Sequence, residues 1–275
     1  MNKYTLAKDL FIDSLENLKF INLDKSKVAY HKIISSLEKP LKLVLFYGKP
    51  GCGKSFLLKK IENDLKQKNK KIILLEQPFY TEAGFYSTLY KKIFNVDEDI
   101  NNYEDFLALF KQNVGQTQEE LKYDGYMIML DEAQLYPDIL IEKIRLLSDT
   151  RMFKFLFTVH KTMAEEDILA QEHFLTRIWE KIELVESSES EVKIYIEKKL
   201  ESLNNDIGKN FFSNKNFKFI FNITKGNLRT VNMLLYKAFE IFEFYEQEKF
   251  SEFNNPKINE KVLEMAALDK GLLDA

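Results

Sequence analysis

The sequence predicts an α/β fold in which a parallel sheet carries helices on both faces and is followed by an all-helical region. Between residues 41 and 185, short apolar runs alternate with stretches of helical periodicity, and strands separated by helices pair in parallel. From Ser187 onward the strand-like runs stop and only helical patterns follow. We therefore expect a core domain at residues 1–187, including a helical N-terminal segment, and a helical domain at residues 188–275.

The predicted strands are continuous apolar runs, which is typical of strands buried on both faces. In chain order they cover residues 41–47, 71–75, 126–130, 153–159 and 181–185. The predicted helices have apolar residues at helical spacing. They cover residues 1–39, 56–61, 85–94, 103–114 and 139–148 in the core, and 189–203, 214–224, 228–244 and 259–268 in the helical domain. Pro40 marks the entry to the first strand, and Ser190 is a candidate cap for the helix that follows it.

The composition favours a cytoplasmic protein that does not span a membrane by itself. Hydrophobic residues make up 45% of the 275 residues, which is enough for a sizeable core. The 40 basic and 43 acidic residues nearly balance, whereas a dominant nucleic-acid footprint usually shows as a basic excess. Cys52 is the single cysteine, so no intrachain disulfide can form. The sequence has neither a signal-peptide pattern nor an apolar run of about 18 residues.

A phosphate-binding loop is the strongest motif in the chain. Residues 48–55 fit the P-loop pattern G-x-x-x-x-G-K-[ST], and they lie between a predicted strand and a predicted helix. In such a loop, glycines let successive N–H groups face one phosphate chain, to which the helix N-terminus adds its positive end. Lys54 can reach the β- and γ-phosphates, and Ser55 can ligate Mg²⁺. The predicted nucleotide-binding residues are Gly48, Lys49, Pro50, Gly51, Cys52, Gly53, Lys54, Ser55 and Phe56.

Two adjacent carboxylates follow the third predicted strand. Asp131 and Glu132 come directly after the apolar run at residues 126–130, as in a Walker B motif. Asp131 would hold Mg²⁺, and Glu132 would polarise the attacking water. A lone acidic pair is most often a solvated turn, but its combination with a P-loop on another predicted strand indicates a site for phosphoryl transfer.

Several further stretches make the chain resemble AAA+ ATPases, and more narrowly the ExeA/GspA (MshM-like) family. They occur in the family's order between about residues 25 and 245. They are residues 131–134 (DEAQ), 139–148 (ILIEKIRLLS), 175–178 (LTRI), 191–196 (EVKIYI) and 224–232 (TKGNLRTVN). The chain departs from the family pattern at the end of the fourth strand and at Leu228, where the family often has proline. The resemblance implies an AAA+ core with a helical lid, and it implies ATP as the nucleotide.

The resemblance also assigns roles to residues outside the two core motifs. Arg177 falls at the arginine finger, which reaches the nucleotide of a neighbouring subunit, and Arg229 falls at sensor 2 on the lid. Either His160 or Thr158 corresponds to sensor 1 at the end of the fourth strand. Because a finger acts in trans, the resemblance implies a homo-oligomer whose hydrolysis of ATP to ADP is stimulated by assembly.

The cellular task is inferred from the resemblance alone. The family suggests an assembly factor for a type II secretion or type IV pilus-like envelope machine. Such a factor would lie in the cytoplasm, peripheral to the inner membrane through a membrane-bound partner. The alternative is a transposition-type AAA+ regulator that binds DNA, which the near-neutral charge does not favour. A further alternative is a module that binds nucleotide without turning it over, against which Lys54, Asp131 and Glu132 argue.

Overall fold

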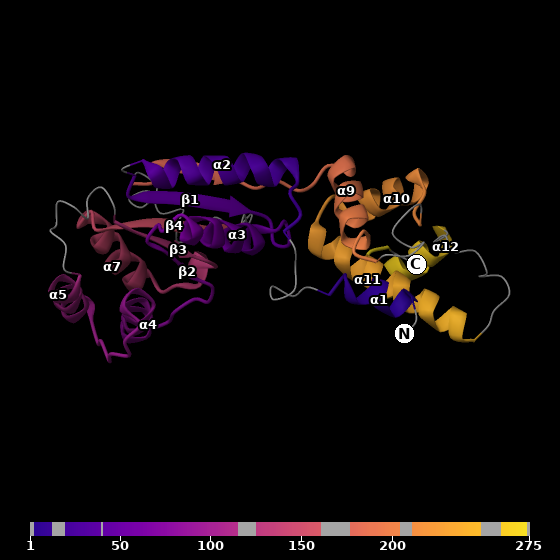
Figure 1. Cartoon of the computed structure of the whole chain (residues 1–275). Helices are drawn as coiled ribbons and strands as arrows, with labels where there is room; N and C mark the ends of the chain where they lie inside the picture. Colours follow the sequence, from indigo (N-terminus) through magenta and orange to yellow (C-terminus); the bar gives the residue numbers. More distant parts are fainter. Residues whose placement is uncertain are drawn as a thin grey trace. The chain divides into compact units, whose positions relative to one another are not determined.

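The computed structural model describes residues 3–12, 20–39, 41–114, 125–160, 177–203, 211–248 and 260–273. Two compact units make up the chain (Figure 1). The core unit consists of residues 28–49 and 54–184, and the helical unit consists of residues 1–27, 50–53 and 185–275. Some predicted features lie outside the described residues, namely residues 1–2 and 13–19 of the first predicted helix, Pro40, residues 175–176 of the arginine-finger motif, and residue 259 of the last predicted helix.

A five-stranded parallel sheet forms the centre of the core unit, as predicted, with the strand order β2-β3-β4-β1-β5. The strands are β1 (Leu43–Gly48), β2 (Ile72–Leu75), β3 (Tyr126–Leu130), β4 (Phe153–His160) and β5 (Glu180–Glu183). Helices cover both faces of the sheet (Figure 1). They are α2 (Asp24–Glu38), α3 (Lys54–Gln67), α4 (Glu82–Phe94), α5 (Tyr103–Asn113), the short η1 (Ala133–Leu135) and α7 (Asp138–Asp149).

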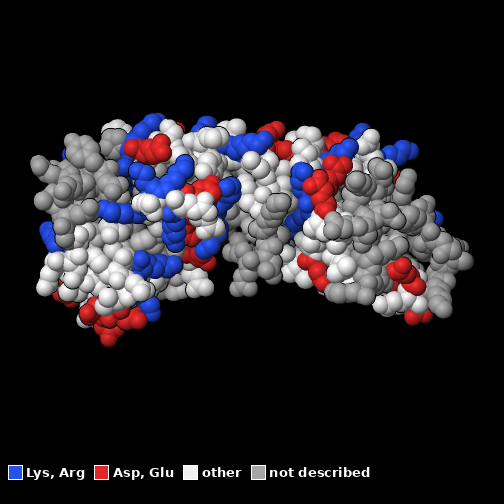
Figure 2. Space-filling model, in the orientation of Figure 1, with Lys and Arg blue, Asp and Glu red and all other residues white. Residues whose placement is uncertain are grey.

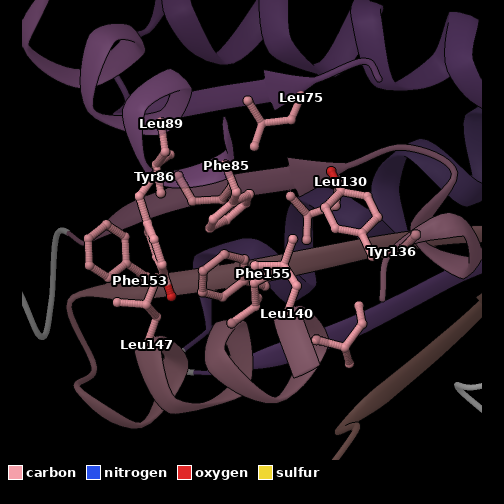
Figure 3. Close-up of a cluster of buried hydrophobic side chains, with 14 of the residues drawn as sticks. Leu75, Phe85, Tyr86, Leu89, Leu130, Tyr136, Leu140, Leu147, Phe153 and Phe155 are labelled. Carbon is pink, nitrogen blue, oxygen red and sulfur yellow. The ribbon is translucent and has the colours of Figure 1, made fainter. Parts of the chain in front are cut away.

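One face of the sheet packs against α4, α5 and α7 through a large aromatic cluster. Phe153 and Phe155 of β4 point from the sheet toward Phe85 and Tyr86 of α4 (Figure 3). All four side chains are almost completely buried. Their neighbours on β4 point to the opposite face, where the buried ammonium group of Lys154 donates to a backbone carbonyl of α2. Because successive strand residues alternate between faces, contacts on both faces of the sheet hold β4 in place. These contacts also position the carboxyl end of β4.

The helical unit packs around α11 (Leu228–Gln247) and includes the N-terminus of the chain. Its other helices are α1 (Lys3–Asp9), α9 (Glu189–Leu200), α10 (Asn214–Thr224) and α12 (Glu260–Asp269). Tyr4 stacks on Phe242 with ring centroids 5.4 Å apart, and Phe11 stacks on Phe239 at 5.7 Å. Residues 1–27 therefore belong to this unit, whereas the sequence analysis placed them with the core.

The N-terminal segment and the start of α9 both differ from expectation in detail. Residues 20–23 are not helical, so the helix expected over residues 1–39 is two helices, α1 and α2. The cap of α9 is Ser188 rather than Ser190, because Ser188 and Glu191 form a reciprocal capping box. None of the described helices combines the length and the apolar composition needed to cross a lipid bilayer.

Candidate nucleotide-binding site

The carboxyl ends of β1, β3 and β4 bring the predicted motifs to one edge of the sheet. Gly48, which opens the P-loop at the end of β1, is paired in register with His160 at the end of β4. On the other side of β4, Leu130 at the end of β3 is paired with Phe157. Since the strands are parallel, the residues that follow them emerge on the same side, where ligands of open α/β sheets bind.

Lys54 closes the base of the P-loop in the core unit. It is the first residue of α3, and only 5% of its surface is exposed. Its ammonium group donates to the carbonyl of Gly48 at 2.8 Å and to that of Lys49 at 3.1 Å. Ser55 follows in the first turn of α3, and its side chain hydrogen-bonds to Asp131. The base of the loop therefore carries a buried cation beside a hydroxyl–carboxylate pair.

The tip of the P-loop belongs to the helical unit and depends on two glycines. Gly51 and Gly53 have φ angles of +79° and +102°, which L-residues with side chains rarely adopt. A Cβ atom on Gly51 would also lie 2.4 Å from the side-chain oxygen of Asn227. The predicted glycine positions are thus required by backbone conformation, and at Gly51 also by the close approach of Asn227. Phe56 lies in the first turn of α3 and is half-buried.

Asp131 is a buried carboxylate held from three sides. Its backbone N–H donates to the carbonyl of Leu75 on β2 at 3.0 Å, and its Oδ1 accepts from the backbone N–H of Glu132 at 3.0 Å. Burial raises the pKa of Asp131, and the hydrogen bond from Ser55 acts in the opposite direction. The oxygens of Ser55 and Asp131 are hard ligands of the kind that Mg²⁺ prefers.

The donor set around Asp131 fits a Mg²⁺ ion that arrives with a nucleotide. Within the described part of the chain, no three His, Cys, Asp or Glu side chains gather as a metal cage. Mg²⁺ keeps several waters and is usually bound through one or two protein ligands together with substrate phosphates. Ser55 and Asp131 match that pattern.

Glu132 is held by two side chains at the mouth of the site. Its φ angle is +52°, a left-handed conformation that is uncommon for this residue type. Oε1 of Glu132 lies 3.0 Å from Nε2 of His160, and Oε2 accepts from the amide of Gln134 at 2.6 Å. Both oxygens of the predicted general base are therefore engaged. The DEAQ motif already contained Gln134, but the sequence analysis gave it no role.

The structure separates the two candidates for sensor 1. His160 reaches Glu132, whereas the hydroxyl of Thr158 is completely buried and has no hydrogen-bond partner among the described residues. Only His160 of the two contacts the predicted catalytic carboxylate. The assignment of either residue to sensor 1 stays a prediction.

Arg177 lies at the edge of the sheet opposite the P-loop. The backbone N–H of Trp179, two residues later, donates to the carbonyl of Leu43 at the start of β1. The Arg177 side chain is 51% exposed, and its Nη1 lies 3.8 Å from a carboxylate oxygen of Asp149. Strand β1 separates this edge from the P-loop by about 17 Å at a rise of about 3.3 Å per residue. Arg177 is therefore too far from its own P-loop to contact a phosphate there.

Arg229 lies at the start of α11 in the helical unit, next to the P-loop tip. Its backbone N–H is 3.3 Å from the carbonyl of Gly51, to which it donates. A Cβ atom on Gly51 would lie 2.8 Å from the Cβ of Arg229. The residue predicted as sensor 2 thus lies next to the tip of the P-loop, and its role in reporting nucleotide state to the lid stays a prediction.

Comparisons with known proteins agree with the fold. Residues 38–165 match the family described as AAA domain. Drosophila ORC bound to DNA superposes with a TM-score of 0.67 at 12% identity, over 98% of this chain and 66% of that chain. Aeropyrum pernix ORC1 in complex with DNA gives 0.65 at 14%, over 96% and 69%. The RuvB Holliday junction branch migration motor of Thermotoga maritima gives 0.54 at 16%, over 94% and 72%.

The strand order, the P-loop and these matches define a P-loop protein with the AAA+ fold. The region matched by the AAA domain family contains the P-loop, Asp131, Glu132 and His160. A comparison with curated protein sequences found no match. The narrower ExeA/GspA resemblance is carried by the sequence motifs alone and stays a prediction.

Proposed function

We propose that this protein binds ATP together with Mg²⁺ and hydrolyses it to ADP and phosphate. The AAA domain match and the convergence of the P-loop with two strand-end carboxylates support this proposal. One structural neighbour, Aeropyrum pernix ORC2, is described in ADPNP–ADP complexes, which supports adenine nucleotides as ligands. The single observation that carries the proposal is the hydrogen bond that joins Ser55 of the P-loop helix to Asp131 after β3.

Each polar group at the base of the loop has a defined task in this proposal. Lys54 would exchange its two loop carbonyls for phosphate oxygens, and Ser55 and Asp131 would hold Mg²⁺, which offsets the charge of the phosphates. Glu132 would accept a proton from the attacking water while the oxygen of that water forms a bond to the γ-phosphorus. The bond between that phosphorus and the bridging oxygen breaks, which leaves ADP. His160 and Gln134 would fix the direction in which Glu132 points.

The experiment that tests this proposal compares phosphate release by the wild type and by Glu132→Gln. We expect turnover to fall by about 100-fold in the variant, because the amide cannot accept the proton, while ATP affinity stays close to that of the wild type. Glu98→Gln is the matched control, since Glu98 is exposed in the connection between α4 and α5. Equal turnover of wild type and Glu132→Gln would remove Glu132 from catalysis, and no heat on titrating ATP into the wild type would overturn the proposal.

Hydrolysis is proposed to depend on self-association. The position of Arg177, remote from its own P-loop and half exposed, supports an arginine finger that completes the site of a neighbouring subunit. A cation supplied in this way offsets the negative charge that develops on the transferred phosphoryl group. Nucleotide would then bridge subunits, and hydrolysis would loosen them, which makes assembly a switch.

The resemblance to the ExeA/GspA family supports a task for this switch. That task is the assembly of a type II secretion or type IV pilus-like envelope machine, with the protein at the inner membrane through a membrane-bound partner. The DNA-bound ORC structures and the RuvB motor among the structural neighbours support the alternative, a DNA-binding regulator. The surface in Figure 2 mixes basic and acidic residues on the face shown, which is not the basic stripe that DNA binding favours.

One pair of measurements separates these two tasks. The Glu132→Gln protein, held in its ATP state, is used to capture partners from membranes and is tested for a mobility shift with duplex DNA. Recovery of a membrane-bound assembly factor supports the envelope task. An ATP-dependent shift that weakens steeply with salt supports the DNA alternative, because phosphate contacts release counterions.

A further inference from the structure

Three consecutive carbonyl groups at the tip of the P-loop each accept a hydrogen bond from the helical unit. The carbonyls belong to residues 50–52. In order along the loop, the donors are the side-chain amide of Asn227 at 2.7 Å, the backbone N–H of Arg229 at 3.3 Å and the ammonium group of Lys25 at 3.1 Å. Two of the donors belong to the start of α11, and Lys25 comes from the start of α2.

These contacts fix the direction of the N–H groups that follow. In a trans peptide the carbonyl and the next N–H point in opposite directions, and the described residues contain no cis bond. Because the carbonyls face Lys25 and the start of α11, the N–H groups of residues 51–53 are turned away from these donors. Successive N–H groups on one side of a loop are what an anion-binding nest requires. The positive φ angles of Gly51 and Gly53 make this arrangement accessible.

Lys25 differs from the other two donors because it ties the loop to a third segment. Its ammonium group also donates to the carbonyl of Val185 at 3.0 Å, at the point where the chain enters the helical unit. Its backbone N–H donates to Oε1 of Glu191 at 2.8 Å. The other oxygen of Glu191 accepts from the backbone N–H of Ser188 at 2.9 Å, which completes the capping box of α9. Lys25 thus joins the P-loop tip to the start of the first lid helix.

The environment of Lys25 is unlike that of a surface lysine. Burial lowers its pKa, while Cys52 and Glu191 raise it by electrostatic attraction. Desolvation of a partly buried ammonium group is compensated by hydrogen bonds, and here backbone carbonyls of two distant segments supply them. Lys27, two residues later on α2, is an ordinary counterpart whose side chain is 47% exposed and pairs with Asp24 within its own helix.

We propose that Lys25 is a positioning residue for the phosphates of a bound nucleoside diphosphate or triphosphate. By bonding to the carbonyl of Cys52, it holds the Cys52–Gly53 peptide with the Gly53 N–H turned toward the nest. A charged donor on the carbonyl also polarises that N–H and strengthens it as a donor to an anion. Because the same ammonium group bonds to Val185, phosphate binding and the position of the lid segment are coupled through one side chain. This inference rests on the proposed nucleotide binding.

The test compares Lys25→Met with its matched control, Lys27→Met. We expect Lys25→Met to bind both ADP and inorganic triphosphate about tenfold more weakly than the wild type by calorimetry, the size expected for loss of one charge-assisted hydrogen bond. Inorganic triphosphate lacks base and ribose, so it reports on the loop alone. Lys27→Met should bind both as the wild type does. Lys25→Arg, which keeps the charge but not the compact shape, should recover part of the affinity.

A spectroscopic readout separates positioning from simple loss of structure. The chain has only 9 glycines, so selective labelling of glycine nitrogen gives a spectrum in which the Gly53 amide can be followed. In Lys25→Met the Gly53 amide proton should move upfield, because the peptide loses its charged donor, while the Gly84 amide on α4 keeps its position. The melting temperature of the nucleotide-free variant should stay close to that of the wild type.

The outcomes are distinct. Unchanged triphosphate affinity in Lys25→Met overturns this inference and leaves ATP binding intact. A fall in affinity that is matched by a large fall in melting temperature, with no selective change at Gly53, also overturns it, because Lys25 would then be structural. If the wild type binds neither ADP nor triphosphate, the proposed function itself fails.

Discussion

The base and the tip of the P-loop are built by different means. At the base, side chains from the core unit supply the chemistry, with Lys54 buried at the start of α3 and Ser55 bonded to Asp131. At the tip, the helical unit supplies donors to backbone carbonyls, and no carboxylate takes part in these three bonds. The loop is therefore built partly by each of the two units. In the proposed function, the base would bind and cleave phosphate, and the tip would shape the loop and link it to the segment that begins at Val185.

The largest effect should come from the base. We expect Lys54→Ala to weaken ATP and ADP binding by about 100-fold, because a buried cation that would contact two phosphates is lost. Isothermal calorimetry measures this directly. Lys68→Ala, in the exposed turn that follows α3, is the control and should bind as the wild type does.

The loss of affinity in Lys54→Ala should exceed the loss in Lys25→Met, for which a tenfold effect is expected at the tip. A loss in Lys54→Ala that is no larger than the loss in Lys25→Met would contradict the division of labour between base and tip. In that case the loop would be a single unit whose two halves contribute equally.

A second prediction concerns the opposite edge of the sheet, where Arg177 lies. We expect Arg177→Ala to lower turnover by about 10- to 100-fold in concentrated solution, while ATP affinity changes little, because the arginine acts on transition-state charge in a neighbour's site. Turnover as a function of protein concentration and ATP calorimetry measure the two effects. Arg151→Ala is a close control, because it removes another exposed arginine at the same end of the sheet, in the turn between α7 and β4.

Mixing two inactive variants tests the trans assignment itself. An Arg177→Ala subunit retains Glu132, and a Glu132→Gln subunit retains Arg177. A mixed assembly therefore contains some complete sites, and phosphate release should recover on mixing. If light scattering detects mixed assemblies and turnover does not recover at any ratio, Arg177 is not a finger, and its pairing with Asp149 is merely structural.

The residues that form the base of the loop could be predicted from the sequence, whereas the donors to its tip could not, for a physical reason. The P-loop and the Asp131–Glu132 pair follow buried apolar strands, and parallel strands bring their carboxyl ends to one edge, so their proximity could be deduced. Lys25 and Asn227 donate to backbone carbonyls. Every residue has a carbonyl, so the sequence of the loop does not indicate which residues donate to it. The amphipathic pattern of the first residues predicts a helix but does not say which core that helix faces. For this reason residues 1–27 were placed with the wrong unit.

Two residues at the end of β4 are candidates for sensor 1, and their surroundings differ in a way that the sequence does not reveal. Thr158 and His160 are two residues apart, so both point to the same face of the strand. The difference is depth, since Thr158 is completely buried within the strand, whereas His160 is its last residue and reaches Glu132. Gln134 was missed because its contact with Glu132 depends on the left-handed backbone at Glu132. That conformation is not a property of the residue type.

The smallest predicted effect is a gain in stability in a variant of the loop base that has lost its activity. Asp131→Asn removes a buried charge but keeps the shape and the acceptor for the Glu132 N–H. We expect Mg²⁺-dependent turnover to be lost and the melting temperature of the nucleotide-free protein to rise by about 2 °C near neutral pH. Asp99→Asn, which is exposed in the connection between α4 and α5, should change neither.

The pH dependence of this gain follows from the direction of the pKa shift. Burial raises the pKa of Asp131 above the ordinary value that an aspartate has in the unfolded chain. Over the interval between the two pKa values, the folded state holds a proton that the unfolded state has released, so the wild type loses stability as pH rises. Asn cannot ionise, so the difference in melting temperature between variant and wild type should be absent below the lower pKa and grow until the higher one is passed. Thermal melts of both proteins between about pH 4 and pH 8 cover this range. A difference that is constant with pH would mean that the hydrogen bonds to Asp131 balance the effect of burial on its pKa, and the ionised carboxylate would then carry no net cost in the folded state.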